Sequence, residues 1–297
     1  MKEKTFTSGR FYNLRHDAEG DGHEEYEYAN AVVYGEIESL EKKDGNVLEV
    51  IAKNPRGTDD EESYDVSINY DGSGKYVYFT NPEHPEYLCC WFDKVPEGYN
   101  KGATFDSCVF ERTVSLKGYK SVIFHNCFFL NPVSVEDSPD CDMISFEQCA
   151  FKGNVTISKC HPDRLFIRNC NVLENLVIDD CIVGKWTSIH DVQIKQVSLV
   201  WDSVFSGQEF MFRRIAIGNG LEFSGCVFES PAEISFCSLE ELRVRGCSFN
   251  KLTVCGIYTH RHLECEELVR ISLGETSCTG DCGTCDDTIC DSSPRER

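Results

Sequence analysis

A short pattern of apolar residues and cysteines repeats along most of this chain and constrains its fold more than any other feature. Each unit holds two apolar residues separated by one position, then two further positions, then a slot that is often Cys. Ile144-Ser145-Phe146-Glu147-Gln148-Cys149-Ala150-Phe151 shows the pattern, with another Phe two positions after the slot. The slot recurs about every 11 residues between residues 108 and 268. A fixed short period without helical spacing predicts a β-solenoid.

Sixteen positions are assigned to the slot, and nine of them hold Cys. A small apolar side chain at each slot suits the narrow interior of stacked coils. The cysteines are Cys108, Cys127, Cys149, Cys160, Cys170, Cys181, Cys226, Cys237 and Cys247, and the other slots are assigned to Tyr119, Ser138, Val192, Asp202, Ile215, Ile257 and Leu268.

The spacing inside one unit predicts the geometry of a coil. Two apolar residues one position apart have the period of a strand with one buried face, and the two-residue skip before the slot predicts a corner. Two units, about 21 residues, then complete one four-sided coil. We therefore expect an all-β fold: a parallel β-helix of about eight coils over residues 103–273, preceded by a smaller, mainly-β region over residues 1–102.

The residue between the two apolar positions of each unit is expected to point outward. Alternate units should share a face, which places Ile123, Phe166 and Met211 in one outward column among residues that suit solvent. An exposed apolar patch of this kind marks an interface, either with a partner or with residues 1–102 folded back over it. This column is Thr104, Ile123, Ser145, Phe166, Ser188, Met211, Glu233 and Thr253; the opposite one is Ser115, Ser134, Thr156, Val177, Ser198, Glu222, Arg243 and Glu264.

Three stretches, Phe124-x-x-Cys127-x-Phe129, Phe146-x-x-Cys149-x-Phe151 and Phe223-x-x-Cys226-x-Phe228, resemble consecutive units of the pentapeptide-repeat family. The resemblance covers about 170 of the 297 residues and implies a right-handed, four-sided parallel β-helix. The period departs from the family's strict 10, and the Asp or Asn favoured before the central Leu or Phe is mostly missing. A three-sided β-helix therefore stays open. Some members of the family resemble duplex DNA and bind topoisomerases, so an acidic DNA mimic is one implied role.

The net charge and the cysteine content limit which partners and which cellular compartment are expected for this protein. The net charge is −21, with −11 in residues 1–102, −6 in residues 103–273 and −4 in residues 274–297. Such acidity argues against direct binding to nucleic acid or to anionic membranes. No run of 18 apolar residues and no apolar segment near Met1 is present, so we expect a cytoplasmic protein. There the 18 cysteines would be mostly reduced thiols in one inward column.

The two ends of the chain lack the repeat. Residues 1–102 contain strand candidates around two turn signals, at residues 43–46 and 71–74, which predict two hairpins. This region either caps the first coil or forms a separate recognition domain. Residues 274–297 form a Cys-rich tail in which four thiols lie close enough in sequence to bind zinc or an iron–sulfur cluster. A flexible tail and a target of thiol modification are the alternatives. The four thiols are Cys278, Cys282, Cys285 and Cys290.

The sequence favours a non-catalytic interaction or scaffold protein that presents a rigid β-helix face to a partner protein, with a homodimer also possible. The alternative is a carbohydrate-active β-helix enzyme, which would need carboxylates gathered at one column. The best candidates are Asp179, Asp180 and Asp191, with Asp202 in an assigned slot, and they are interpreted as solvated corner residues. We assign no catalytic residue.

Overall fold

The structure, a computed structural model of the whole chain, describes residues 102–255 continuously. Shorter described pieces precede and follow this range: residues 12–14, 26–28, 37–42, 47–53, 61–67, 77–78, 86–88, 91–93 and 95, and residues 257–259. All regular structure in these ranges is β-strand. The described residues contain no helix long and apolar enough to cross a membrane.

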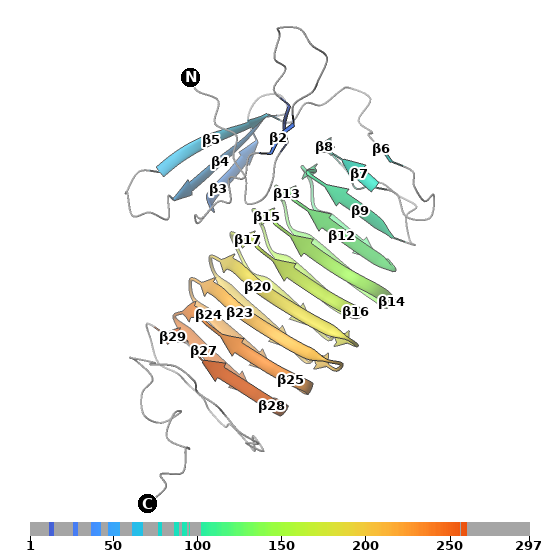
Figure 1. Cartoon of the computed structure of the whole chain (residues 1–297), viewed down its shortest axis with the longest axis vertical. Helices are drawn as coiled ribbons and strands as arrows, with labels where there is room; N and C mark the ends of the chain where they lie inside the picture. Colours follow the sequence, from blue (N-terminus) through green and yellow to red (C-terminus); the bar gives the residue numbers. More distant parts are fainter. Residues whose placement is uncertain are drawn as a thin grey trace, which may run out of the picture.

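The chain from residue 103 winds as a parallel β-solenoid (Figure 1). The first turn comprises β9 (Ala103–Asp106), β10 (Val109–Phe110) and β11 (Val114–Lys117) before β12 (Ser121–His125) stacks in parallel on β9. The later strands are β13 (Phe128–Phe129), β14 (Val133–Glu147), β15 (Ala150–Phe151), β16 (Val155–Arg168), β17 (Asn171–Val172), β18 (Leu176–Asp179), β19 (Ile182–Val183), β20 (Trp186–Ile194), β21 (Val197–Trp201), β22 (Val204–Phe205), β23 (Glu209–Ile217), β24 (Gly220–Ser224), β25 (Val227–Ser235), β26 (Ser238–Leu239), β27 (Glu241–Arg245), β28 (Ser248–Cys255) and β29 (Tyr258–Thr259).

Two of the stacked faces matter for function, and we call them face A and face B. Face A consists of β9, β12 and the in-register segments 143–147, 164–168, 186–190, 209–213, 231–235 and 251–255. Face B is the narrower stack of β10, β13, β15, β17, residues 193–194, residues 216–217 and β26. Two further stacks run through β11 and β18 and through β19 and β22. Each turn therefore contributes to four stacks, as the two-unit coil predicts.

The solenoid has about seven turns, one fewer than the eight coils expected from the sequence. From β9 onward, face A contains eight stacked segments, and eight segments enclose seven complete turns between them. The last units of the sequence repeat, with slots at Ile257 and Leu268, run to the edge of the described residues or beyond it.

The predicted corners are backbone turns in the left-handed region. For the slots from Cys108 to Cys247, the residue just before the slot has positive φ, a conformation that Gly, Asn and Asp adopt most readily. In eleven corners a residue other than glycine adopts it: Ser107, Asn126, Asp137, Gln148, Lys159, Asn169, Asp180, Asp191, Asp202, Arg214 and Phe236. Glycine supplies the remaining three, Gly118, Gly225 and Gly246. The two-residue skip in the sequence is thus where the chain turns from one face to the next.

These corners correct one slot assignment. Asp202 has a φ of 44° and is exposed, so it is a corner residue, and the slot is Ser203, which is fully buried. The same one-residue error affects the predicted opposite column, which assigns Ser198 to an outward position. Leu199, and not Ser198, pairs with Val177 and Glu222 on the outer side, while Ser198 is buried.

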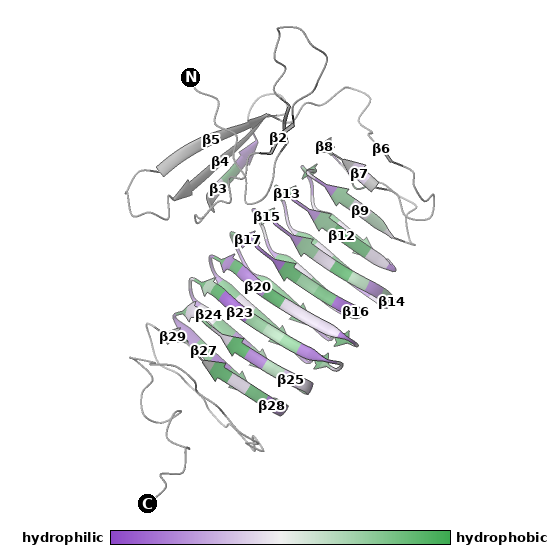
Figure 2. Ribbon diagram, in the orientation of Figure 1, coloured by the Kyte–Doolittle hydropathy of each residue, from purple (hydrophilic) through white to green (hydrophobic). Residues whose placement is uncertain are grey.

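Aromatic rings fill the first turns of the core. Inward rings of successive turns stack almost parallel, with centroids 4.9 Å apart for Phe105 and Phe124 and 5.2 Å apart for Phe124 and Phe146. A second stack joins Phe110, Phe129 and Phe151 at 4.9 and 4.7 Å. Figure 2 shows the resulting alternation of hydrophobic and hydrophilic residues along the face A strands. In these turns the Phe two positions after the slot is therefore a buried core residue.

Parallel stacking begins before residue 103. β7 (Glu86–Leu88) pairs in parallel with β9, and β8 (Trp91–Phe92) pairs in parallel with β10, so both belong to the stack. β6 (Val77–Tyr78) pairs antiparallel with β7, and the second predicted turn, at residues 71–74, lies outside the described residues. The first hairpin is confirmed by β3 (Ile37–Lys42) and β4 (Val47–Lys53), and β5 (Glu61–Ser67) completes an antiparallel sheet. A separate antiparallel pair is formed by β1 (Tyr12–Leu14) and β2 (Tyr26–Tyr28).

Candidate interaction surface

The predicted outward column lies on face A as one continuous ladder. Ile123 pairs with Ser145, Ser145 with Phe166, Phe166 with Ser188, and Ser188 with Met211. Ile123, Phe166 and Met211 are each partly exposed. The structure confirms this register, but it separates the three apolar residues by a serine at every second level. Ser145, between the first two, is buried.

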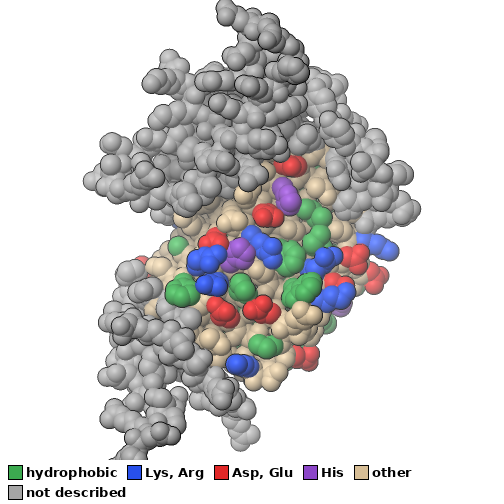
Figure 3. Space-filling view, viewed as in Figure 1, with side chains coloured by type: hydrophobic (Ala, Val, Ile, Leu, Met, Phe, Trp, Pro, Cys, Tyr) green, Lys and Arg blue, Asp and Glu red, His purple; other side chains and the backbone are tan. Residues whose placement is uncertain are grey.

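A second outward column on face A carries half of its Asp, Glu, Lys and Arg residues and both of its histidines. From the first turn onward it reads Asp106, His125, Glu147, Arg168, His190, Arg213 and Ser235. Its acidic end is internally paired, since His125 Nε2 lies 3.5 Å from Glu147 Oε2. Its basic end consists of three consecutive levels, Arg168, His190 and Arg213, which we call the Arg–His row. Figure 3 shows a row of blue and purple side chains crossing the middle of this face beside hydrophobic ones.

Each arginine of the Arg–His row lies over an aromatic ring. The Arg168 guanidinium carbon is 4.0 Å from the centroid of Phe166, and that of Arg213 is 5.4 Å from Phe236. Such cation–π contacts hold a guanidinium flat against the surface. The Nε atoms of Arg168 and Arg213 are buried without a hydrogen-bond partner. Within the described chain neither guanidinium pairs with a carboxylate, so both retain an unneutralised charge.

The corner beside the Arg–His row contains a compact ion cluster. Arg214 donates from Nε and Nη2 to the two carboxylate oxygens of Asp191, both at 2.6 Å, and His190 Nδ1 lies 2.8 Å from Asp191 Oδ2. The Arg214 guanidinium, and more weakly His190, lower the pKa of Asp191 below its usual value. Asp191 is therefore a neutralised structural carboxylate, which does not suit it to proton transfer.

Phe236 is the least expected residue on this surface. It is a bulky aromatic residue at a φ of 54°, a conformation that costs L-residues about 1–2 kcal/mol. Its side chain is nevertheless 51% exposed, the most exposed large hydrophobic residue in the described chain. Backbone strain of this kind persists where surrounding structure or function requires it. The Phe236 ring is therefore stabilised little by burial in the core, and it contacts Arg213, which lies on face A.

Several of these residues could have been found in the sequence by their offset from the slot. Arg168, His190 and Arg213 each lie two positions before a slot, and Phe236 lies one position before Cys237. The sequence analysis followed only the middle position of each unit and so missed them. It also missed Trp186, which lies in a third outward column on face A between Arg164 and Glu209 and is 40% exposed, with Nε1 donating to Gln208 Oε1 at 3.0 Å.

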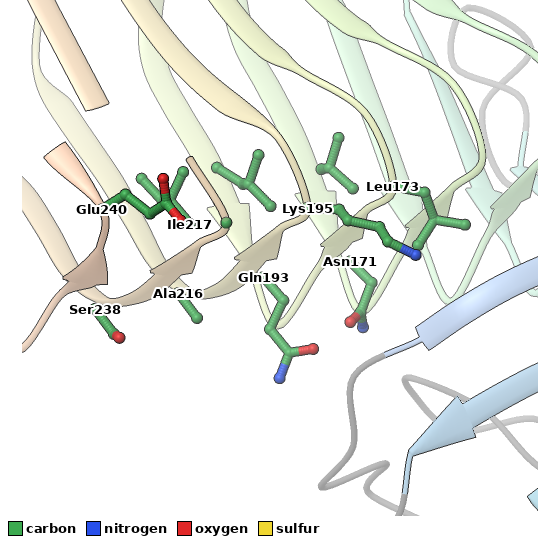
Figure 4. A pocket seen from close by; sticks show the side chains of 11 residues that line it. Asn171, Leu173, Gln193, Lys195, Ala216, Ile217, Ser238 and Glu240 are labelled. Carbon is green, nitrogen blue, oxygen red and sulfur yellow. The ribbon is translucent and has the colours of Figure 1, made fainter. Parts of the chain in front are cut away.

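A shallow groove lies on face B (Figure 4). Its volume is about 280 Å³, and Asn171, Gln193, Ala216 and Ser238 line it at four successive levels. The side-chain oxygens of Asn171 and Gln193 are buried without partners. Lys195 and Glu240 lie at its rim. The groove therefore offers amide and hydroxyl groups along its floor and one charge of each sign, Lys195 and Glu240, at its rim.

The thiols at the slots are structural. Each one donates to the carbonyl oxygen two residues before it, and most also approach a carbonyl of the previous turn; Cys127 Sγ lies 3.1 Å from His125 O and 3.4 Å from Phe105 O. Burial raises the pKa of the Cys127 and Cys170 thiols, and raises that of Cys141 to about 12. The ten cysteines of the solenoid whose side chains are described are all free, and of these ten only Cys247 is not fully buried.

The metal prediction falls outside the part of the chain that the structure describes. Cys278, Cys282, Cys285 and Cys290 all belong to the undescribed C-terminal residues. Among the residues that are described, no three His, Cys, Asp or Glu side chains are grouped to hold a metal ion.

Comparisons with known proteins returned nothing: no family model matches the chain, and no curated protein or solved structure is significantly similar to it. Function is therefore argued from the surfaces alone.

Proposed function

We propose that this protein is a non-catalytic interaction or scaffold protein whose solenoid presents face A to a partner protein. The observation that carries this proposal is the set of partly exposed apolar side chains on the outer side of one parallel sheet: Ile123, Phe166, Met211 and Trp186, with Phe236 at the adjoining corner. Interfaces combine aromatic, Met and Arg side chains in this way, with the large rings acting as anchors. A second copy of the chain is one possible partner.

The solenoid suits this role because its backbone is fixed by hydrogen bonds on both sides of every inner strand. A rigid surface loses little conformational entropy when a partner binds. We place this function in the cytoplasm, where the free slot thiols stay reduced. We further propose that the coil is a lengthened form of the pentapeptide-repeat coil, supported by its four stacks per turn and its small inward slot residues.

Neither alternative function gains support from a described site. A carbohydrate-active enzyme would use free carboxylates facing each other across neighbouring levels, whereas Glu147 contacts His125 and Asp191 is held by Arg214. A DNA mimic would present a dense row of acidic side chains, whereas face A carries the Arg–His row at its centre.

The test is quantitative capture of partners from the native host, identified by mass spectrometry. Phe166→Ser with Met211→Ser should leave the melting temperature nearly unchanged, since outward residues cost within about 0.5–1 kcal/mol when shortened. The same variant should lose the specific partner. Ile182→Ser is the matched control, because Ile182 is 44% exposed but lies on a different stack, paired with Val204. Equal partner recovery by all three proteins would reject face A as the interface.

A further inference from the structure

We infer that the Arg–His row binds an acidic segment of the partner protein, with the carboxylates of that segment at Arg168 and Arg213. This inference rests on the proposed function and adds the chemistry of the partner. Arg168 pairs in register with His190, and His190 with Arg213, so the two arginines lie two levels apart. At the usual strand spacing this separation is about 10 Å.

The two guanidinium groups are already positioned for anions. Arg168 lies over Phe166 and Arg213 over Phe236, which restricts the rotation of both side chains before any partner arrives. No carboxylate of the described chain neutralises either group, although a carboxylate does neutralise Arg214 at the next position. A planar guanidinium binds a carboxylate through two parallel hydrogen bonds, so each arginine offers one carboxylate-binding position.

Charge complementarity favours an acidic peptide over a nucleic acid. The whole chain carries −21, and its field repels a long polyanion. The Arg–His row is only three levels long, with Glu147 next to Arg168 at one end and Ser235 next to Arg213 at the other. Screening limits its attraction to roughly 8–10 Å at physiological salt, which is enough for a few carboxylates in contact. A segment with two acidic residues about 10 Å apart, three residues of extended chain, matches the row.

Phe236 strengthens the assignment because its backbone conformation is unfavourable for a ring that the core does not bury. Replacing it by Asn, which tolerates positive φ, should raise the melting temperature. The same replacement removes the platform of Arg213 and should weaken the binding of an acidic segment. If Phe236→Asn both stabilises the protein and weakens binding, Phe236 contributes to binding at the expense of stability.

The test measures the binding of a fluorescein-labelled twelve-residue peptide with Glu at every third position by fluorescence anisotropy. The full-length protein should bind it and should not bind the same peptide with Gln in place of Glu. Arg168→Gln with Arg213→Gln should weaken the Glu peptide about tenfold, the loss of two partly exposed ion pairs. Arg245→Gln is the matched control, because Arg245 is exposed on β27, away from face A. It should bind the peptide as the unchanged protein does, and melting curves should show that every variant is folded.

Three outcomes would overturn the inference: no binding of the Glu peptide, equal binding by the double arginine variant, or tighter binding of a single-stranded oligonucleotide of matched charge. The capture experiment with Phe166→Ser and Met211→Ser separates this failure from failure of the proposed function. If the partner is lost there while the Glu peptide never binds, face A is an interface for a non-acidic partner. If capture is unaffected, the proposed function itself fails.

Discussion

The corner residues of the solenoid have a steep conformational preference, and Phe236 is the residue that departs furthest from it. Asn occupies the equivalent position at Asn126 and Asn169 with φ near 52°. Phe236→Asn should therefore raise the free energy of unfolding by about 1 kcal/mol, since a left-handed bulky residue costs about 1–2 kcal/mol. Urea denaturation at neutral pH measures this change.

Phe236→Ala separates the ring from the backbone. Alanine lacks the ring but keeps the same penalty for positive φ, so its stability should stay near that of the unchanged protein. If Asn and Ala stabilise equally, the ring itself is unfavourable and the backbone argument is wrong.

Asp191 provides a prediction about pH. Arg214 lowers the pKa of Asp191, so the folded protein is more stable with Asp191 deprotonated than with Asp191 protonated. The resulting stability is fully present above the unfolded value, near 3.9, and is lost as pH falls through the lower folded value. Asp191→Asn keeps a residue that tolerates positive φ, and at pH 7 it should cost about 0.5–1 kcal/mol.

The difference between Asp191→Asn and the unchanged protein should shrink as the pH is lowered below about 4, which denaturation curves at several pH values would show. Asp180→Asn is the control, because Asp180 is an exposed corner carboxylate with a φ of 49°. A loss that is the same for both substitutions, or that does not depend on pH, would mean that the Arg214 contact adds no stability.

At the scale of the strand and its corner, the slot thiols predict a graded reactivity. Only the thiolate reacts readily with alkylating agents, and burial keeps the slot thiols Cys127 and Cys170, and Cys141 outside the slots, protonated and covered. Cys247 is partly exposed, so among the ten cysteines whose side chains are described it should be alkylated first when native protein is treated with iodoacetamide. Peptide-resolved mass spectrometry would distinguish it from the rest. Alkylation of Cys170 before Cys247 would contradict the buried corner.

The same element shows what sequence reasoning could find. The period, the inward slot and the outward column with Phe166 were predictable, because they depend only on spacing along one strand and one corner. The single failure, at Asp202, arose where Ser replaces Cys in the slot. Phe205 lies two positions after Ser203, which is the spacing of Phe from the slot in other units and so identifies Ser203 as the slot. Ser203 Oγ donates to Trp201 O at 2.7 Å, as the slot thiols donate to the carbonyl two residues before them. A hydroxyl can therefore occupy a buried slot.

The Arg–His row and the face B groove were harder to find, because each depends on residues that are far apart in sequence and become neighbours only when turns stack. Arg168 and Phe236 are 68 positions apart, yet both belong to one surface through Arg213. The described structure also gives no prediction of chemistry for the tail, since Cys278 and its neighbours lie outside it. The spacing of residues within one unit predicts the shape of a coil. Which residues become neighbours on the surface depends on how successive coils align.

Considered as a whole molecule, the solenoid differs between face A and face B in how far its first turns are covered. Val109, Phe128 and Ala150 point outward on face B but are at most 1% exposed, so the first turns of that face are covered. β3 provides one described contact there, because Lys42 Nζ donates to Glu111 Oε2 at 2.7 Å. Figures 1 and 4 both show the β3–β5 sheet beside this part of the solenoid. Face A is open over the turns that contain the Arg–His row (Figure 3).

The start of the stack gives a prediction for the whole molecule. Parallel strands at an open end leave unpaired backbone groups and a bare core, which promotes edge-to-edge association. Here β7 and β8 close that end, with Tyr87 stacked on Phe105 at 4.9 Å and Phe92 on Phe110 at 5.2 Å. Deleting residues 1–85 keeps this cap, whereas deleting residues 1–102 removes it. Both deletions lose β3, so the difference between them reports the cap alone.

We expect the longer deletion to melt at a lower temperature and to elute as aggregates in size-exclusion chromatography, since it uncovers Phe105 and Phe110 in addition to the strand edge. The shorter deletion should remain more stable and less associated at the same concentration. Substituting Tyr87→Ser and Phe92→Ser in the shorter deletion should move its behaviour toward that of the longer one, because these rings are the buried part of the cap. If the two deletions melt and elute alike, β7 and β8 add no measurable stability, and they do not protect the first turn of the solenoid from association.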